Sequence, residues 1–195
     1  MEEERGSIIG SDEVLKGDTF GGIVVAAVKA DREKREQLVT LGVTDSKLID
    51  DSKVLALAPK IEQLTSCIVK SLYPSEYNAF KGSITDMLNH LHKECYDYLK
   101  PGTHIVDKFP GCTVGDVIEI HAESKYIEVA AASIIARAHG LKQLNDLSKR
   151  AGFTIPKGST HVAEALNELK ERNLYPNEFV KLNFRNVKEA LGKSL

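Results

Sequence analysis

Hydrophobic and polar residues follow two periodicities along the chain, and these predict a sheet flanked by helices. Runs rich in β-branched residues predict strands over 7–14 and 22–29, joined by a turn that contains glycines. Further strands are expected over 67–73, 104–107 and 116–120. Three strands followed by alternating helices and strands are typical of one mixed sheet in an α/β fold. We therefore predict about five strands.

Apolar residues at helical spacing place helices between these strands. Asp31 is expected to cap a short charged helix over 32–41 that ends at Gly42, and Asp50 or Asp51 a second short helix that ends near Pro59. The other segments are predicted as an irregular stretch over 74–83, and helices over 84–99, 125–151 (capped by Ser124) and 160–172. A single domain over 1–195 is expected, with a core over about 6–152 and a small helical extension over about 153–195.

Composition describes an ordinary globular protein. The 195 residues are 42% hydrophobic and 28% charged, and the longest apolar runs are too short to cross a bilayer, so no membrane partner is expected. The acidic start differs from a secretory signal, and three scattered cysteines fit reduced thiols, which together predict a cytoplasmic protein. The net charge of −2 gives no support for nucleic-acid binding, so such binding would depend on a local basic patch.

Two adjacent acids near the glycine turn are the first candidate site. Asp12 and Glu13 follow a pair of isoleucines, and buried carboxylates need a cation or strong donors, for which Mg²⁺ or Mn²⁺ is suited. The alternative is a pair of solvated turn residues. Strand neighbours also point to opposite faces, so a shared site needs a strand end or a kink there. Asp107 and Glu123 fall at or just after other strand ends, where ligands bind in such folds, and this favours the metal site.

Several motifs occur in a single order along the chain, at spacing typical of one family. The chain resembles the type 2 ribonucleases H over nearly its whole length, and the ribonuclease HIII branch more than the HII branch. The motifs that carry the resemblance are Gly10-Ser-Asp-Glu-Val, Val24-Val-Ala-Ala, Leu41-Gly-Val-Thr-Asp-Ser-Lys, Val106-Asp-Lys-Phe, Ala122-Glu-Ser-Lys-Tyr, Val129-Ala-Ala-Ala-Ser and Lys181-Leu-Asn-Phe.

The resemblance implies a ribonuclease H-like fold and a specific chemistry. Enzymes of this family cleave the RNA strand of RNA–DNA hybrids with two Mg²⁺ or Mn²⁺ ions, leaving 3′-hydroxyl and 5′-phosphate ends. By motif, the catalytic and metal-binding acids are Asp12, Glu13, Asp107 and Glu123. The expected partner is hybrid nucleic acid and the expected state is a monomer. Two metal ions that activate water and stabilise the leaving oxygen require no histidine or cysteine, which suits this sequence.

The sequence departs from the family pattern in the turn after the first acids. The family's Gly-x-Gly turn, which recognises ribose 2′-hydroxyls through its backbone, here reads Leu15-Lys16-Gly17. A leucine would be strained where the backbone needs a positive φ. The family's N-terminal substrate-binding domain is also expected to be absent, with weaker affinity for the hybrid as the consequence.

Further polar residues are assigned to the substrate, each with a simpler structural interpretation. The loop residues Asp45, Ser46 and Lys47 correspond to a family motif, with Lys47 expected at a phosphate. The lysines Lys16, Lys125 and Lys157 are also placed near phosphates, although a solvated surface charge is the default for each. His90 and Glu94 are expected on an exposed helix face, Ser133 as a packing residue bonded to a backbone carbonyl, and Tyr77-Asn78 at the groove or in loop packing.

Two other functions remain as alternatives to the nuclease. One is a hybrid-binding protein of the same fold, catalytically weak or silent because of Leu15. The other is a metal phosphohydrolase that acts on small molecules. The presence of all four acids favours the nuclease.

Overall fold

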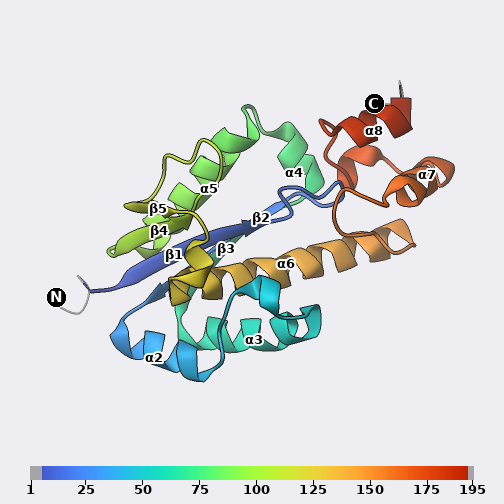
Figure 1. The fold of residues 1–195 in the computed structure, drawn as a ribbon. Helices are drawn as coiled ribbons and strands as arrows, with labels where there is room; N and C mark the ends of the chain where they lie inside the picture. Colours follow the sequence, from blue (N-terminus) through green and yellow to red (C-terminus); the bar gives the residue numbers. More distant parts are fainter. Residues whose placement is uncertain (1–5, 193–195) are drawn as a thin grey trace. The chain divides into compact units, whose positions relative to one another are not determined.

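The computed structural model describes residues 6–192 and contains one five-stranded sheet (Figure 1). The strand order is β3-β2-β1-β4-β5. The strands are β1 (Ile8–Val14), β2 (Ile23–Ala30), β3 (Ser66–Leu72), β4 (Thr103–Asp107) and β5 (Val117–Glu119). The predicted α/β class with a mixed five-stranded sheet is confirmed.

Three of the strands run parallel, and this determines where the acids lie. β1 pairs with β4 in parallel, with Ile8 opposite Thr103, and β4 pairs in parallel with β5, with Asp107 opposite Glu119. Parallel neighbours end at the same edge of a sheet, so the carboxyl ends of β1, β4 and β5 share one edge.

The chain divides into two compact units, each assembled from separate stretches of the sequence. The first unit contains the chain up to Glu13, Val25–Lys70 and Gly82–Ala138, and the second contains Val14–Val24, Ser71–Lys81 and the chain from His139 onward. All four candidate acids belong to the first unit, and the Leu15-Lys16-Gly17 turn belongs to the second. The single-domain assignment stays a prediction.

In the first unit, the two faces of β1 pack against different helices, α5 (Ile84–Leu99) and α6 (Ile127–Ala151), which lie on opposite sides of the strand (Figure 1). A Cβ on Gly10 would lie 2.3 Å from the amide nitrogen of Val129 in α6. Ser11, the next residue, instead bonds His92 of α5. The alternation of strand side chains therefore directs one residue toward each helix.

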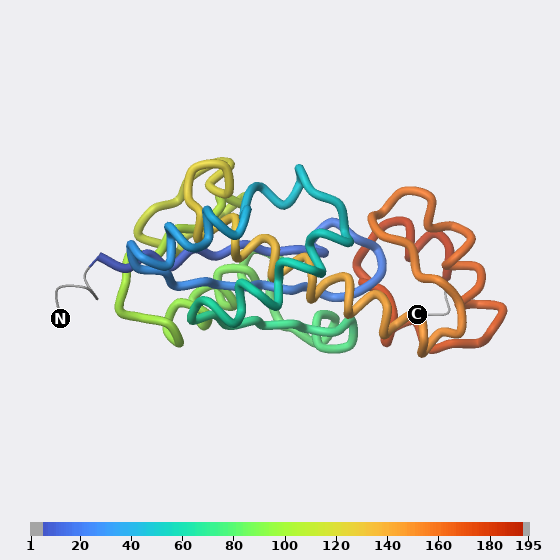
Figure 2. The backbone as a smooth tube through the Cα atoms, turned by 90° about the horizontal axis from the view of Figure 1, so that it is seen from below, coloured from blue at the N-terminus to red at the C-terminus, as the bar shows by residue number. Residues whose placement is uncertain are grey.

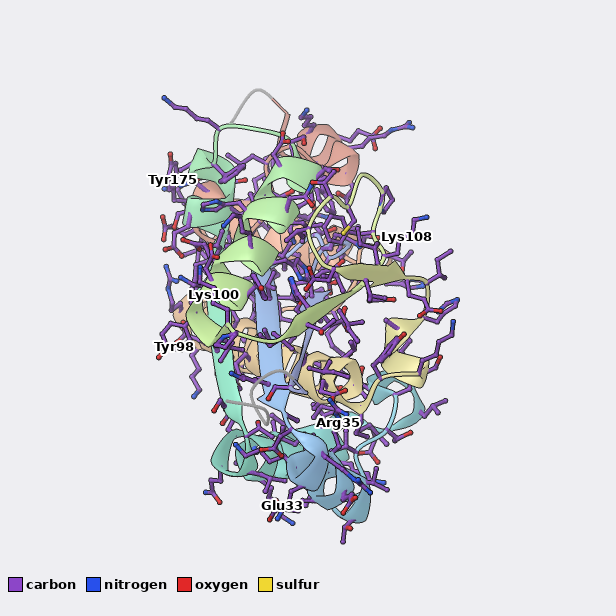
Figure 3. All side chains as sticks on the ribbon, turned by 90° about the vertical axis from the view of Figure 1, so that its left-hand side faces the viewer. Glu33, Arg35, Tyr98, Lys100, Lys108 and Tyr175 are labelled. Atoms are coloured by element: carbon purple, nitrogen blue, oxygen red, sulfur yellow. The ribbon has the colours of Figure 1, made fainter. Side chains whose placement is uncertain are left out.

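The charged helix α2 (Arg32–Thr40) begins where the sequence predicts. Its N-cap Asp31 accepts a hydrogen bond from the Lys34 amide at 2.9 Å. Arg35, labelled in Figure 3, forms an ion pair with buried Glu128 in the first turn of α6. This contact joins α2 to α6.

The predicted end of the second helix at Pro59 is wrong, because α3 (Asp51–Leu64) continues through it. Proline removes one helical hydrogen bond, here to the carbonyl of Leu55, whose side chain is exposed. On both sides of the proline the helix buries apolar residues, and this packing outweighs the missing bond. Those residues are Val54, Leu57, Ala58 and Ile61.

Two other helix starts differ from the sequence predictions. The stretch expected to be irregular contains α4 (Pro74–Ala79), where proline occupies the first turn and Glu76 accepts a hydrogen bond from the Tyr73 amide at 2.7 Å. The long helix α6 begins at Ile127 rather than Lys125, because Ala122–Ser124 forms a separate 3-10 turn. Ser124 is therefore not the cap of α6.

The C-terminal extension is helical, as predicted, and contains α7 (Ala163–Glu171), the 3-10 turn Pro176–Glu178 and α8 (Arg185–Leu191). In Figure 2, the orange and red segments after α6 fold against one another. Phe20 bridges Val180 in antiparallel fashion, so this extension also pairs with the turn between β1 and β2. Within residues 6–192, no helix combines the length and the apolar character needed to cross a membrane.

Candidate active site

Each of the four predicted acids lies near the shared edge of the parallel strands. Asp12 and Glu13 come directly before Val14, the last residue of β1. Asp107 ends β4, and Glu123 lies in the 3-10 turn after β5. The Asp107 carboxylate accepts a hydrogen bond from the Ala122 amide at 2.9 Å. That bond ties the end of β4 to the turn that carries Glu123.

Asp12 and Glu13 turn toward different helices. β1 continues through both residues to Val14, so the strand neither ends nor breaks between them. Asp12 accepts a hydrogen bond from Ser133 of α6, and the Oε2 atom of Glu13 lies 3.3 Å from Nε2 of His92 in α5. The two carboxylates therefore follow the strand alternation, yet their charges still interact.

This interaction contributes to the pKa shifts of the acids. Burial raises the pKa of Asp12 to about 7, with further contributions from the negative charges of Glu13 and Asp107. Hydrogen bonds from Ser133 and from the Glu13 amide, at 2.8 Å, act in the opposite direction. Burial likewise raises the pKa of Asp107, and the charges of Glu123 and Glu13 add to it. The acids thus form one cluster of negative charge.

Glu123 forms an ion pair with Lys47. Its side chain is 2% exposed, and Oε1 lies 2.5 Å from the Lys47 ammonium. Burial alone would raise the pKa of Glu123, but the hydrogen bond and charge of Lys47 lower it below its ordinary value. The same hydrogen bond raises the pKa of Lys47. The second oxygen, Oε2, is buried and has no hydrogen-bond partner among the described residues.

The loop that carries Lys47 is fixed to α6. Asp45 caps the 3-10 turn Ser46–Leu48 through a 2.8 Å bond from the Lys47 amide, and Arg137 donates to the carbonyl of Ile49 at 3.0 Å. Ser46 Oγ lies 2.8 Å from Ser133 Oγ. Ser133 therefore bonds Ser46 and Asp12 rather than the backbone carbonyl that the sequence analysis assigned to it.

Behind Glu13 lies a buried polar chain that the sequence analysis missed. Ser11 Oγ lies 2.8 Å from Nδ1 of His92 and 2.8 Å from Nε2 of His104, and all three side chains are buried. Burial lowers the pKa of His104 to about 4, helped by the proximity of His92, so His104 is neutral. One tautomer set fits the two bonds of Ser11: His104 donates to Ser11, and Ser11 donates to Nδ1 of His92. Nε2 of His92 then lies 3.3 Å from Glu13 Oε2 and makes no hydrogen bond within residues 6–192.

A signal for His92 does exist in the sequence. It lies four residues after Leu88 and three before Cys95, on the buried face of α5. A histidine on such a face requires a buried polar partner. His90, two residues earlier, lies 3.7 Å from Glu94 on an exposed surface, as predicted.

The other predicted substrate residues are distributed over both units. In the first unit, Lys125 forms an ion pair with Glu119. Lys16, Gly17 and Lys157 belong to the second unit. Also in the second unit, Asn78 donates to the Val180 carbonyl at 2.9 Å, which supports the loop-packing interpretation of that residue.

Leu15 adopts the backbone conformation that the sequence analysis identified as strained. Its φ is +68°, in the left-handed region that favours glycine, while its side chain is buried. The ideal Cβ of Gly21 lies 3.0 Å from Cδ1 of Leu15, and that of Gly140 lies 3.4 Å from its Cγ. The leucine thus keeps the left-handed turn and fills the space beside two glycines.

The acids suit a divalent cation by chemistry and charge. Carboxylate oxygens are the ligands that Mg²⁺ and Mn²⁺ prefer, and one close ion pair with Lys47 leaves most of the negative charge of the cluster uncompensated. As the side chains lie, no three His, Cys, Asp or Glu residues within 6–192 are grouped to hold one ion. Asp12 instead bonds Ser133 and the Glu13 amide, and Glu123 bonds Lys47.

Comparison with known proteins identifies the family. The model of the Ribonuclease HII family matches residues 9–110 and 103–187. This chain belongs to the ribonuclease HII family. Among relatives, the Ribonuclease HIII of Geobacillus kaustophilus is 35% identical over 96% of this chain and 69% of its own length, and that of Mycoplasma pneumoniae is 31% identical over 94% of both. The predicted resemblance to type 2 ribonucleases H is confirmed.

The ribonuclease HII family assignment agrees with the fold. A crystal structure of Bst-RNase HIII in complex with Mn²⁺ superposes with a TM-score of 0.84 at 32% identity, covering 97% of this chain and 71% of that one. The ribonuclease H-like architecture predicted from the motifs is therefore confirmed.

Proposed function

We propose that this chain is a divalent-metal-dependent endoribonuclease that cleaves the RNA strand of RNA–DNA hybrids. The observation that carries the proposal is the cluster of Asp12, Glu13, Asp107 and Glu123 at one edge of the sheet, where burial and the neighbouring negative charges raise the pKa of Asp12 and of Asp107. Such mutual perturbation is typical of functional sites. Membership of the ribonuclease HII family, with relatives named Ribonuclease HIII, supplies the substrate class.

The four acids would hold Mg²⁺ or Mn²⁺. Two such ions, when bound, supply activation of a water molecule and stabilisation of the leaving 3′-oxygen, which gives 3′-hydroxyl and 5′-phosphate products. Ser133, itself held by Ser46, orients Asp12 for this role. His92 orients Glu13 from the other face of the sheet.

Contacts to the nucleic acid would come from several lysines and from one backbone turn. The Lys47 side chain is 66% exposed, so its ammonium can pass from Glu123 to a substrate phosphate as the acids bind metal. Lys125, Lys16 and Lys157 would contact further phosphates, which position the substrate without reading its sequence. The backbone of Leu15-Lys16-Gly17 would recognise ribose 2′-hydroxyls.

The conformation of Leu15 bears on the alternative of a silent hybrid-binding protein. That alternative depends on leucine spoiling the turn. Leu15 instead adopts a positive φ without leaving the interior. The sequence departure therefore gives the alternative no support.

Cleavage of an end-labelled RNA–DNA hybrid tests the proposal. We expect endonucleolytic products with 3′-hydroxyl ends in Mg²⁺ or Mn²⁺, none in excess chelator, and no cleavage of the corresponding DNA duplex. A chain that binds the hybrid without cutting it in either metal would be a binding protein. Turnover of a nucleotide monophosphate in place of the hybrid would instead indicate a small-molecule phosphohydrolase.

His92→Gln is expected to reduce cleavage without changing substrate affinity. Glutamine cannot both bond Ser11 and fill the space beside the Glu13 carboxylate as the ring does, so Glu13 loses the side chain that packs against it. Residues behind metal ligands typically account for about 10–100-fold in activity, and we expect kcat to fall by about tenfold. Steady-state kinetics on the hybrid measure this effect. His90→Gln, on the exposed face of α5, is the matched control and should leave kcat unchanged.

A further inference from the structure

Lys181 is a fully buried lysine in the second unit whose ammonium group contacts three backbone carbonyls. Its Nζ donates to the carbonyl oxygens of Leu15 at 2.8 Å, Asp18 at 2.6 Å and Gly21 at 3.0 Å. An ammonium has three N–H donors, so this arrangement satisfies each of them. All three acceptors belong to the turn that connects β1 and β2.

The surroundings of Lys181 favour its charged form. Burial lowers its pKa to about 7. A neutral amine, however, has only two N–H groups and could not donate to all three carbonyls. The rings of Tyr77 and Phe184 also lie with their centroids 5.3 Å from Nζ, where aromatic faces attract a cation. The lysine therefore acts as a buried cation enclosed by carbonyls and rings.

The contact with Leu15 determines the direction of one peptide group. The carbonyl of Leu15 and the amide N–H of Lys16 lie in the same planar trans unit and point in opposite directions. Because the Lys181 ammonium and the Asp18 amide, at 3.1 Å, both donate to the Leu15 carbonyl, the two together fix the orientation of the Lys16 amide. They do so next to the strained φ of +68° at Leu15, where the backbone would otherwise relax.

Other residues from the C-terminal extension bind the same turn. Thr19 donates its amide to the Gly158 carbonyl at 2.9 Å, and Gly158 donates its own amide to the Asp18 carboxylate at 2.6 Å. Gly21 donates its amide to the Phe179 carbonyl at 3.0 Å. These contacts hold the later part of the turn. The Leu15 carbonyl accepts instead from the Asp18 amide within the turn and from Lys181, which is its side-chain donor from the C-terminal extension.

We propose that Lys181 is a positioning residue that sets the Leu15–Lys16 peptide for recognition of the ribose strand. The proposal rests on the proposed function, in which the Leu15-Lys16-Gly17 backbone reads 2′-hydroxyl groups. It assigns the C-terminal extension the role of shaping that turn. Lys181 itself touches neither substrate nor metal, and its effect passes through Leu15.

The test compares Lys181→Met, which is one atom shorter and has no donor, with Lys181→Gln, which has two N–H donors. Lys188→Met, the same change at an exposed lysine of α8, is the control. For Lys181→Met we expect KM for the hybrid to rise about tenfold, equal to about 1.4 kcal/mol, while kcat stays within about threefold because the acids are untouched. Lys181→Gln should lie between Lys181→Met and the unsubstituted chain.

A second readout separates positioning from general stability. In an Asp12→Asn background, which cannot cleave, binding is measured to the RNA–DNA hybrid and to the DNA duplex of the same sequence. We expect Lys181→Met to lower the ratio of the two affinities by about tenfold. In the Lys181→Met protein, adding Leu15→Gly should bring the affinity ratio back to at least half of its value in the chain with native Lys181, because glycine adopts positive φ without strain.

Different outcomes would contradict the positioning role of Lys181 and the proposed nuclease function. If folded Lys181→Met keeps its KM and its affinity ratio within twofold of the unsubstituted chain, the positioning role is wrong. It is also wrong if thermal unfolding shows that neither Lys181→Met nor Lys181→Gln folds, since the lysine then supports the whole unit. A chain with native Lys181 that neither cuts the hybrid nor prefers it to DNA would overturn the proposed function, and this inference with it.

Discussion

Asp12→Asn is expected to abolish hybrid cleavage and, without metal, to make the protein more stable near neutral pH. Asparagine retains the shape of the side chain and can still bond Ser133, but it removes the negative charge that would bind the cation. We expect the cleavage rate to fall by at least about 10³-fold, equivalent to roughly 4 kcal/mol of barrier. Single-turnover cleavage in Mg²⁺ and in Mn²⁺ measures this loss.

The gain in stability follows from the direction of the Asp12 pKa shift. The pKa rises from 3.8 in the unfolded chain to about 7 in the folded one, so the folded state holds a proton that the unfolded state has lost. The stability contributed by this group is present below the unfolded pKa and is lost as pH rises through the folded pKa. Asparagine does not ionise, so the stability of the variant should exceed that of the unsubstituted chain increasingly between about pH 4 and pH 7.

Urea unfolding in chelator at several pH values tests this expectation. Above about pH 7.5 we expect Asp12→Asn to be more stable by ~1–2 kcal/mol, less than 1.36 kcal/mol for each pKa unit because the half-buried carboxylate retains some water. Asp97→Asn, an exposed acid of α5, should change neither cleavage nor this pH dependence. With Mn²⁺ added, the unsubstituted chain should become more stable than Asp12→Asn, because a cation that binds only the folded chain stabilises it. Equal stability of Asp12→Asn and the unsubstituted chain at every pH would contradict the buried charge cluster.

The sequence predicted the order of strands and helices well, because long apolar periods carry most of the relevant information. It failed where a local signal was outweighed or overlooked. Pro59 predicts a helix end, but Leu57, Ala58 and Ile61 continue the buried face of α3 and keep the helix intact. Pro74 and Glu76 are ordinary start signals of a helix, and their spacing could have revealed α4.

For the site, the sequence supplied the acids but not the residues that support them. Asp12, Glu13, Asp107 and Glu123 are recognisable because acids at strand ends are uncommon and the family motifs contain them. His92 and Ser133 contact these acids from distant helices. Each is also bonded to a serine far away in the sequence: His92 to Ser11, 81 residues away, and Ser133 to Ser46, 87 residues away. Which helix faces which side of β1 depends on tertiary packing. The local sequence of the strand or of either helix does not contain this information.

The packing of β1 against α6 also predicts a large loss of stability for Gly10→Ala. A Cβ at Gly10 would lie 2.3 Å from the Val129 nitrogen and 2.4 Å from the Glu128 carbonyl carbon, and both are backbone atoms that cannot rotate away. The strand and helix would have to separate in a region where Val129 is fully buried. Overpacking in a core typically costs about 1–3 kcal/mol, and a clash with backbone belongs at or above the upper end of that range.

Gly17→Ala is the matched control for Gly10→Ala, because nothing lies within 4 Å of a Cβ at Gly17 and its φ is not in the left-handed region. Thermal and urea unfolding should place Gly10→Ala at least about 3 kcal/mol below the unsubstituted chain, and Gly17→Ala within about 0.5 kcal/mol of it. The expected loss has a further consequence for the acids, since Asp12 and Glu13 follow Gly10 by two and three residues. Any separation of β1 from α6 moves Asp12 away from Ser133, so a Gly10→Ala protein that still folds should cleave poorly. Full stability and full activity of Gly10→Ala would show that β1 and α6 do not pack as closely as described.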